Sequence, residues 1–176
     1  MSSIDTNSTS YKNAQLSNLV YSNTFDAGVV KHNGAGQARL YDQFFDDNGD
    51  FREEVKANPD MVAYIGDSNS EIATMMKSYN VLGVDSNHTT GYQGIALQPT
   101  GDENKGQAIF VNRGTEPTIT DITTDVILGV NEYNPVTDIP NMQVNSSIDF
   151  ADSVLRGNNF TSVQMTGHSL GGYLAV

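Results

Sequence analysis

The stretch VQMTGHSLGGYLAV, residues 163–176, carries the pattern on which the interpretation of the whole chain depends. Within it, Gly167-His168-Ser169-Leu170-Gly171 has the spacing G-x-S-x-G, which places a serine on a strained turn between a strand and a helix. Glycines on both sides of the serine, followed by Gly172, let neighbouring backbone approach without a clashing Cβ. The pattern predicts Ser169 as a nucleophile, with the amide of Leu170 binding the oxyanion that forms. The alternative interpretation is a glycine-rich turn with only a structural role.

The sequence around this turn predicts a layered α/β fold. Alternating apolar residues predict a strand over 160–167, and a helix follows from Ser169. Two extended runs, 90–99 and 106–114, are joined by a polar loop and predict a hairpin. Helical spacing predicts helices over 11–21, 37–47, 51–58, 67–80, 118–130 and 144–155, of which 118–130 also has the β-branched composition of a strand. Helices, a hairpin, then helix, strand and helix form a layered α/β order.

Within these helices the apolar positions predict the buried faces. Leu16, Leu19 and Val20 recur at helical spacing, and so do Leu40, Phe44 and Phe45. Ser70 is predicted to cap the helix that follows it. The helix over 144–155 is expected to end at Gly157 and to bury Val144, Ile148, Ala151, Val154 and Leu155.

The net charge and residue composition exclude or disfavour several kinds of binding partner and site. The formal net charge of −12 disfavours nucleic acids and anionic membrane surfaces, which are themselves polyanions. The chain has no cysteine, which excludes disulfides, thiolate metal sites and cysteine nucleophiles. No apolar run reaches the ~20 residues of a transmembrane helix, and the N-terminus lacks the pattern of a secretory signal peptide. Both a cytoplasmic protein and one secreted without such a peptide fit this composition.

Three motifs together resemble a known family. IFVNRGTE (109–116), DITTD (121–125) and the glycine-rich turn are similar to the class 3, or fungal-type, lipases of the α/β-hydrolase fold, including their bacterial lipase and phospholipase relatives. The similarity covers about residues 92–176. It implies an incomplete α/β-hydrolase sheet over 91–176, whereas residues 1–90 form a mainly helical segment that matches no motif of the family.

The resemblance also implies roles for individual residues. Ser169 is the nucleophile, and the backbone amides of Thr115 and Leu170 form the oxyanion hole. Gly167, His168, Gly171 and Gly172 support the turn. Asp121 and Asp125 match a D-x-x-x-D element that supports the oxyanion loop, although Ile122 stands where the family often has an aromatic residue. Residues 116–142 correspond to the lid, in which Ile127, Leu128, Val130 and Tyr133 either cover an acyl site or pack into the core.

The catalytic base is not evident in the sequence. In this fold the triad follows the order Ser, Asp or Glu, His, but no acidic residue or histidine follows Ser169. His168 is expected to be a buried packing residue of the turn, while His32 and His88 are expected to be solvated loop residues. We therefore expect a chain truncated after the turn, with an unpaired strand edge over 160–166 through which copies could self-associate.

These observations predict a carboxylic ester hydrolase that acts on lipids, in the manner of a triacylglycerol lipase or a phospholipase A1, and that is inactive as this fragment. Its partners are an ester or lipid substrate and a lipid–water interface. The reaction of an acyl-serine enzyme needs no metal or cofactor. The alternative is a non-catalytic lipid-binding or interaction module that keeps the turn as structure.

Overall fold

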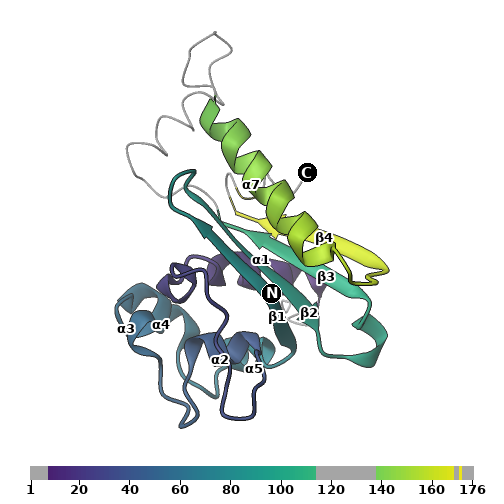
Figure 1. The fold of residues 1–176 in the computed structure, drawn as a ribbon. Coiled ribbons are helices and arrows are strands. Elements are labelled where there is room, and N and C mark those ends of the chain that lie inside the picture. The colour runs from purple at the N-terminus through teal and green to yellow at the C-terminus, as the bar shows by residue number, and fades with distance from the viewer. Residues whose placement is uncertain (1–7, 114–137, 169–170, 172–176) are drawn as a thin grey trace, which may run out of the picture.

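The computed structural model describes residues 8–113, 138–168 and 171, and these form a mixed α/β fold around a four-stranded sheet (Figure 1). The sheet consists of β1 (Tyr79–Asn87), β2 (Tyr92–Pro99), β3 (Gln107–Asn112) and β4 (Ser162–Gly167). The preceding helices are α1 (Thr9–Leu19), η1 (Asn23–Phe25), α2 (Leu40–Phe44), α3 (Glu53–Lys56), α4 (Pro59–Ile65) and α5 (Glu71–Met76). The short η2 (Asp102–Asn104) joins β2 to β3, and α7 (Asp138–Leu155) precedes β4. The α/β class is confirmed. The predicted helices over 118–130 and 169–176 lie outside the described residues, except for Gly171.

The strands follow their sequence order across the sheet. β1, β2 and β3 form consecutive antiparallel pairs, which confirms the predicted hairpin between β2 and β3. β4 pairs with β3 in parallel, with Asn112 opposite Gly167. Because they are parallel, β3 and β4 end at the same edge of the sheet, and the connection between them includes α7.

Two apolar cores lie on opposite faces of the sheet. Ala108 and Phe110 of β3 face α7, whereas Ile109 and Val111 face the N-terminal helices, as the two-residue period of a strand requires. α7 runs diagonally over its face, and the N-terminal helices cover the other (Figure 1). The fold therefore has three layers: helices, sheet and helix.

The N-terminal helices confirm part of the prediction and correct part of it. α1 buries Leu16, Leu19 and Val20 completely, as expected. The predicted helix over 37–47 is reduced to Leu40–Phe44, because Phe45 is extended and forms an isolated β-bridge with Phe51. Leu40, Phe44 and Phe45 are nevertheless buried as predicted.

α4 was missed because Pro59 was interpreted as the end of a helix. Proline also favours the first position of a helix, where its missing N–H is not needed. The side chain of Asn58 caps α4 by accepting a hydrogen bond from the amide of Met61 at 3.1 Å. The predicted cap at Ser70 is confirmed, since its hydroxyl accepts from the amide of Ala73 at 3.1 Å.

β1 is the largest difference from the sequence prediction. The helix expected over 67–80 ends at Met76, and Tyr79 begins a nine-residue strand. Gly83, Asp85 and Asn87 are poor strand formers. An irregularity between Val81 and Gly83 also shifts the pairing with β2, so the apolar alternation that marks a strand is broken.

α7 begins earlier than predicted, and it packs four of the five predicted residues against the sheet cluster, namely Val144, Ala151, Val154 and Leu155. The prediction was wrong only for Ile148. Ile148 is 59% exposed, whereas Phe150 is 7% exposed and packs on the sheet. The polar residues Gln143 and Ser147 are also buried. The side-chain amide of Gln143 donates a hydrogen bond to the carbonyl oxygen of Thr90 at 2.8 Å. Among the described helices, none has the length and apolar composition needed to cross a membrane.

β4 is the least buried strand of the described sheet. No described strand pairs with its outer edge, and Val163 is 50% exposed. A parallel strand is usually covered on both faces and flanked on both sides. Among the described strands, β4 therefore has β3 as its one neighbour, and no described strand covers its other edge.

Candidate functional site

The candidate site lies where β3 and β4 end side by side. Asn112, the last residue of β3, is the partner of Gly167, the last residue of β4. A Cβ on either Gly167 or Gly171 would lie less than 3.0 Å from the carbonyl oxygen of Asn112, which is closer than Cβ atoms come to other atoms in proteins. A Cβ on Gly171 would also meet the carbonyl carbon of Arg113. Only glycine fits at positions 167 and 171.

The two glycines belong to different kinds of structure: Gly167 is the last residue of β4, and Gly171 is helical. The amide of Gly171 donates a hydrogen bond to the carbonyl oxygen of His168 at 3.0 Å, and Gly171 is buried and helical. The order strand, turn, helix is the one that the G-x-S-x-G spacing predicts. Of the predicted turn residues, the structure describes Gly167, His168 and Gly171.

His168 does not have the surroundings expected for it. Its side chain is exposed, so the prediction of a buried packing residue was wrong. The imidazole meets the ring of Tyr21 edge-on, with 6.5 Å between ring centroids and an interplanar angle of 76°. His168 follows the last residue of β4, and its contact lies at the end of α1.

Arg113 follows directly after β3, and its side chain contacts Gln93, Asp26 and Tyr21. Its guanidinium hydrogen-bonds the side-chain oxygen of Gln93 and lies 3.6 Å from the carboxylate of Asp26. It also lies over the ring of Tyr21, 5.4 Å from the centroid. The Arg113 side chain is only 14% exposed. A cation held between a carboxylate, an amide and an aromatic face has little freedom to move.

The N-terminal segment takes part in the site, which the sequence did not predict. Besides Tyr21 and Asp26, Ser17 of α1 contacts β4 directly, because its hydroxyl lies 3.2 Å from that of Thr166. Ser17 is 5% exposed although it is polar. A small polar residue within the apolar face of a helix is the only sequence feature that pointed to this contact.

A buried polar pair lies beneath the site on the α7 side. The hydroxyl of Tyr92 donates to the side-chain oxygen of Asn112 at 2.9 Å. Burial raises the pKa of Tyr92, so its hydroxyl remains protonated and able to donate. Asn112 is 1% exposed, and its side-chain nitrogen has no hydrogen-bond acceptor among the described residues.

Most of the predicted catalytic residues cannot be located. The described residues do not include the predicted nucleophile, oxyanion-hole and supporting residues Ser169, Leu170, Gly172, Thr115, Asp121 and Asp125. They also do not include the predicted lid residues Ile127, Leu128, Val130 and Tyr133. His32 and His88 are exposed in loops, as predicted. Within residues 8–113 and 138–168, no group of three His, Cys, Asp or Glu side chains is placed to hold a metal ion.

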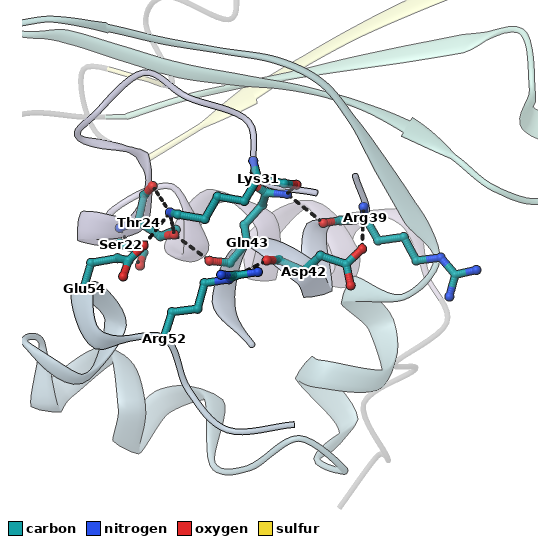
Figure 2. Close-up of polar contacts among 8 residues, drawn as sticks. All are labelled: Ser22, Thr24, Lys31, Arg39, Asp42, Gln43, Arg52 and Glu54. Carbon is teal, nitrogen blue, oxygen red and sulfur yellow. Dashed lines mark hydrogen bonds and ion pairs between the residues drawn. The ribbon is translucent and has the colours of Figure 1, made fainter. Parts of the chain in front are cut away.

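A second polar cluster lies within the N-terminal helices and connects η1 to α2 and α3 (Figure 2). The ammonium of Lys31 donates to the hydroxyl of Thr24 at 2.6 Å and pairs with the carboxylate of Glu54 at 2.7 Å. The hydroxyl of Thr24 in turn donates to the carbonyl oxygen of Gln43. The Gln43 side chain bonds both the amide and the carbonyl oxygen of Lys31.

This cluster has a structural role. A lysine beside a hydroxyl could serve as a base, but the ammonium of Lys31 is held by the carboxylate of Glu54 and the hydroxyl of Thr24. Thr24 is 1% exposed, and its hydroxyl already donates to the backbone, so it is not available to a substrate. The cluster therefore anchors η1, and with it the neighbouring Tyr21 and Asp26.

Comparison with known proteins gives no relative: no family model, no curated protein and no solved structure matches the chain. The resemblance to class 3 lipases rests on the motifs quoted above.

Proposed function

We propose that this chain carries the nucleophile and oxyanion parts of a serine carboxylic ester hydrolase that acts on lipids, similar to a triacylglycerol lipase or a phospholipase A1. The packing of Gly167 and Gly171 against the end of β3 is the observation that supports this most directly. It is the close backbone approach for which the G-x-S-x-G spacing requires glycine. The finer proposal for the fold is that β1–β4 belong to an α/β-hydrolase sheet.

In this proposal the hydroxyl oxygen of Ser169 attacks the ester carbonyl carbon. The amides of Thr115 and Leu170 stabilise the oxyanion, with Asp121 and Asp125 supporting the loop that carries Thr115. The carbon–oxygen bond to the alcohol breaks, the alcohol leaves with a proton, and water hydrolyses the acyl-serine. The proposal assigns none of the three histidines as the base, because His32 and His88 are exposed in loops and His168 packs on Tyr21.

A fluorophosphonate probe tests the nucleophile. The serine oxygen bonds to phosphorus, fluoride leaves and the hydroxyl proton passes to solvent, which gives a stable adduct that peptide mass spectrometry locates. An oxyanion hole retains part of its effect without a triad, so Ser169 is expected to react faster than an ordinary serine. Ser153 is the internal control, an exposed serine whose hydroxyl donates to the carbonyl oxygen of Phe150 at 2.7 Å. Equal labelling of the two serines would contradict the proposal.

The second candidate is a non-catalytic lipid-binding or interaction module, which is favoured by the positions of the three histidines. It predicts that the chain binds vesicles of a neutral phospholipid and leaves Ser169 no more reactive than Ser153. Vesicle flotation combined with the labelling experiment separates the two candidates.

A further inference from the structure

The ring of Tyr21 contacts the ends of both strands that form the candidate site. Its face lies under the guanidinium of Arg113, which follows β3, and it meets the imidazole of His168, which follows β4. Both distances, 5.4 and 6.5 Å, fall in the range of attractive aromatic contacts. One side chain thus contacts the residues that follow two neighbouring strands.

Two further contacts connect the same N-terminal segment to the same two strands. Asp26 pairs with Arg113 at 3.6 Å and accepts a hydrogen bond from the side chain of Gln93 at 3.3 Å. Ser17 lies against Thr166 of β4. The segment from α1 to η1 therefore touches each strand end at more than one point.

The segment is itself firmly anchored. The amide of Tyr21 donates to the carbonyl oxygen of Asn18 at 3.2 Å in the last turn of α1. Thr24, between Tyr21 and Asp26, belongs to the cluster around Lys31 and Gln43 (Figure 2). Tyr21 is thus held by α1 on its N-terminal side and by the cluster around Thr24 on its C-terminal side.

We propose that Tyr21 is a positioning residue of the Gly167–Gly171 turn, and that Asp26 assists it through Arg113. The turn packs on the backbone of Asn112 and Arg113, so a side chain that fixes Arg113 and His168 together fixes both surfaces of that contact. The catalytic consequence rests on the proposed function: a nucleophile displaced by about 1 Å loses up to about 100-fold in rate. The mainly helical N-terminal segment would then be part of the site and not an accessory to it.

The test compares three tyrosine variants. Tyr21→Leu removes both ring contacts, and Tyr21→Phe keeps them. Tyr41→Leu is the matched control, because Tyr41 also lies under a cation, Lys77 at 4.6 Å, and stacks on Phe45 away from the turn. Two quantities are measured: hydrogen exchange of the Gly171 amide, and the inactivation of Ser169 by the fluorophosphonate, separated into probe affinity and maximal rate.

Tyr21→Leu is expected to raise exchange of the Gly171 amide about tenfold over Tyr41→Leu, which corresponds to about 1.4 kcal/mol. It is also expected to lower the maximal inactivation rate about 10–100-fold with little change in probe affinity. Tyr21→Phe, which keeps both ring contacts, should lie closer to wild type than Tyr21→Leu in both quantities. Equal Gly171 exchange in Tyr21→Leu and Tyr41→Leu would overturn the proposal.

A second variant and a second measurement still test the proposal if Tyr21→Leu does not fold or if Ser169 does not react. If Tyr21→Leu does not fold, Asp26→Asn tests the assisting contact with Arg113 by an isosteric change, and Asp152→Asn, which breaks the exposed pair with Arg156, is its control. Faster Gly171 exchange in Asp26→Asn than in Asp152→Asn supports the proposal, and equal exchange overturns it. If wild-type Ser169 reacts no faster than Ser153, the proposed function fails, while the exchange measurement still decides the role of Tyr21.

Discussion

The carbonyl oxygen of Asn112 occupies the space that a side chain at Gly171 would need. These residues are far apart in sequence but join the end of one strand to the first turn of the helix after its neighbour. The obstructing atom belongs to the backbone of a paired strand, so it cannot move aside as the end of a flexible side chain could.

Gly171→Ala is therefore expected to destabilise the fold by about 1–3 kcal/mol, the usual cost of overpacking. Gly83→Ala is the control, because its Cβ would meet only side-chain atoms of Phe150 and Val154, each at 3.3 Å. Those atoms can shift, and the loss of chain entropy in the unfolded state partly offsets the crowding. Urea unfolding of both variants checks the difference, and equal losses would mean that the turn relaxes away from β3.

The ion pair between Lys31 and Glu54 makes a contribution to stability that is lost in acid. Burial raises the pKa of Glu54, but the hydrogen bond and charge of Lys31, its own backbone amide and Arg52 together lower it below the ordinary 4.5. A pKa lowered by folding gives stability that is present above the unfolded value and is lost as pH falls through the folded value.

Glu54→Gln should therefore lower the melting temperature at pH 7, and the difference from wild type should shrink as the pH falls below about 4.5. Glu53→Gln is the control, since Glu53 is 87% exposed and pairs with Lys56 on the surface. Melting curves from pH 3 to pH 7 measure both variants. A difference independent of pH would show that the charge of Glu54 is not what stabilises the fold.

Asp85 of β1 is expected to behave in the opposite way. Burial raises its pKa above the ordinary 3.8, although a hydrogen bond from the backbone of Ser86 partly offsets this. Its contribution is most favourable below the unfolded pKa and is lost as pH rises through the folded value. Asp85→Asn should therefore be more stable than wild type at pH 7 and similar to it near pH 3. Asp149→Asn, in the same groove between β1 and α7, is the control for a general change in net charge.

The outer edge of β4 should make the chain self-associate. No described strand covers this edge, and Val163 on it is 50% exposed. An open strand edge with an exposed valine is a template for strand addition. Sedimentation velocity should show association that increases with concentration, and Val163→Lys should suppress it. Ile148→Lys provides the comparison, because Ile148 is exposed to a similar extent on α7. If both variants suppress association, the association is nonspecific hydrophobic contact and not strand pairing at β4.

The parts of the fold with strong local patterns could be predicted from the sequence. The hairpin of β2 and β3, strand β4 and the cap at Ser70 depend on apolar alternation or on side chains close in sequence. β1 could not be predicted in this way, since Gly83 and Asp85 are tolerated only because β2 supplies the pairing. Ile148 was misplaced because Gln143 and Ser147 satisfy their polar groups under α7 and occupy part of its buried face.

The candidate site was predictable at the turn but not around it. Spacing alone pointed to Gly167 and Gly171, because the G-x-S-x-G pattern lies within five consecutive residues. Tyr21 and Asp26 gave no indication of their place beside Arg113, since no pattern in one sequence relates a residue to a partner about ninety positions away. Such contacts follow from the packing of α1 and η1 on the sheet and become visible only in three dimensions.

The contact between Ser17 and Thr166 joins residues separated by 149 positions. Contacts of such long range close large loops and slow folding, because the entropy of closure is lost before the contact forms. At a synthesis rate of about 5–20 residues per second, β4 leaves the ribosome roughly 7–30 s after α1. During that interval the face of α1 that will meet β4 lacks its partner. The newly made chain therefore passes through a stage in which chaperones can bind this surface before the site assembles.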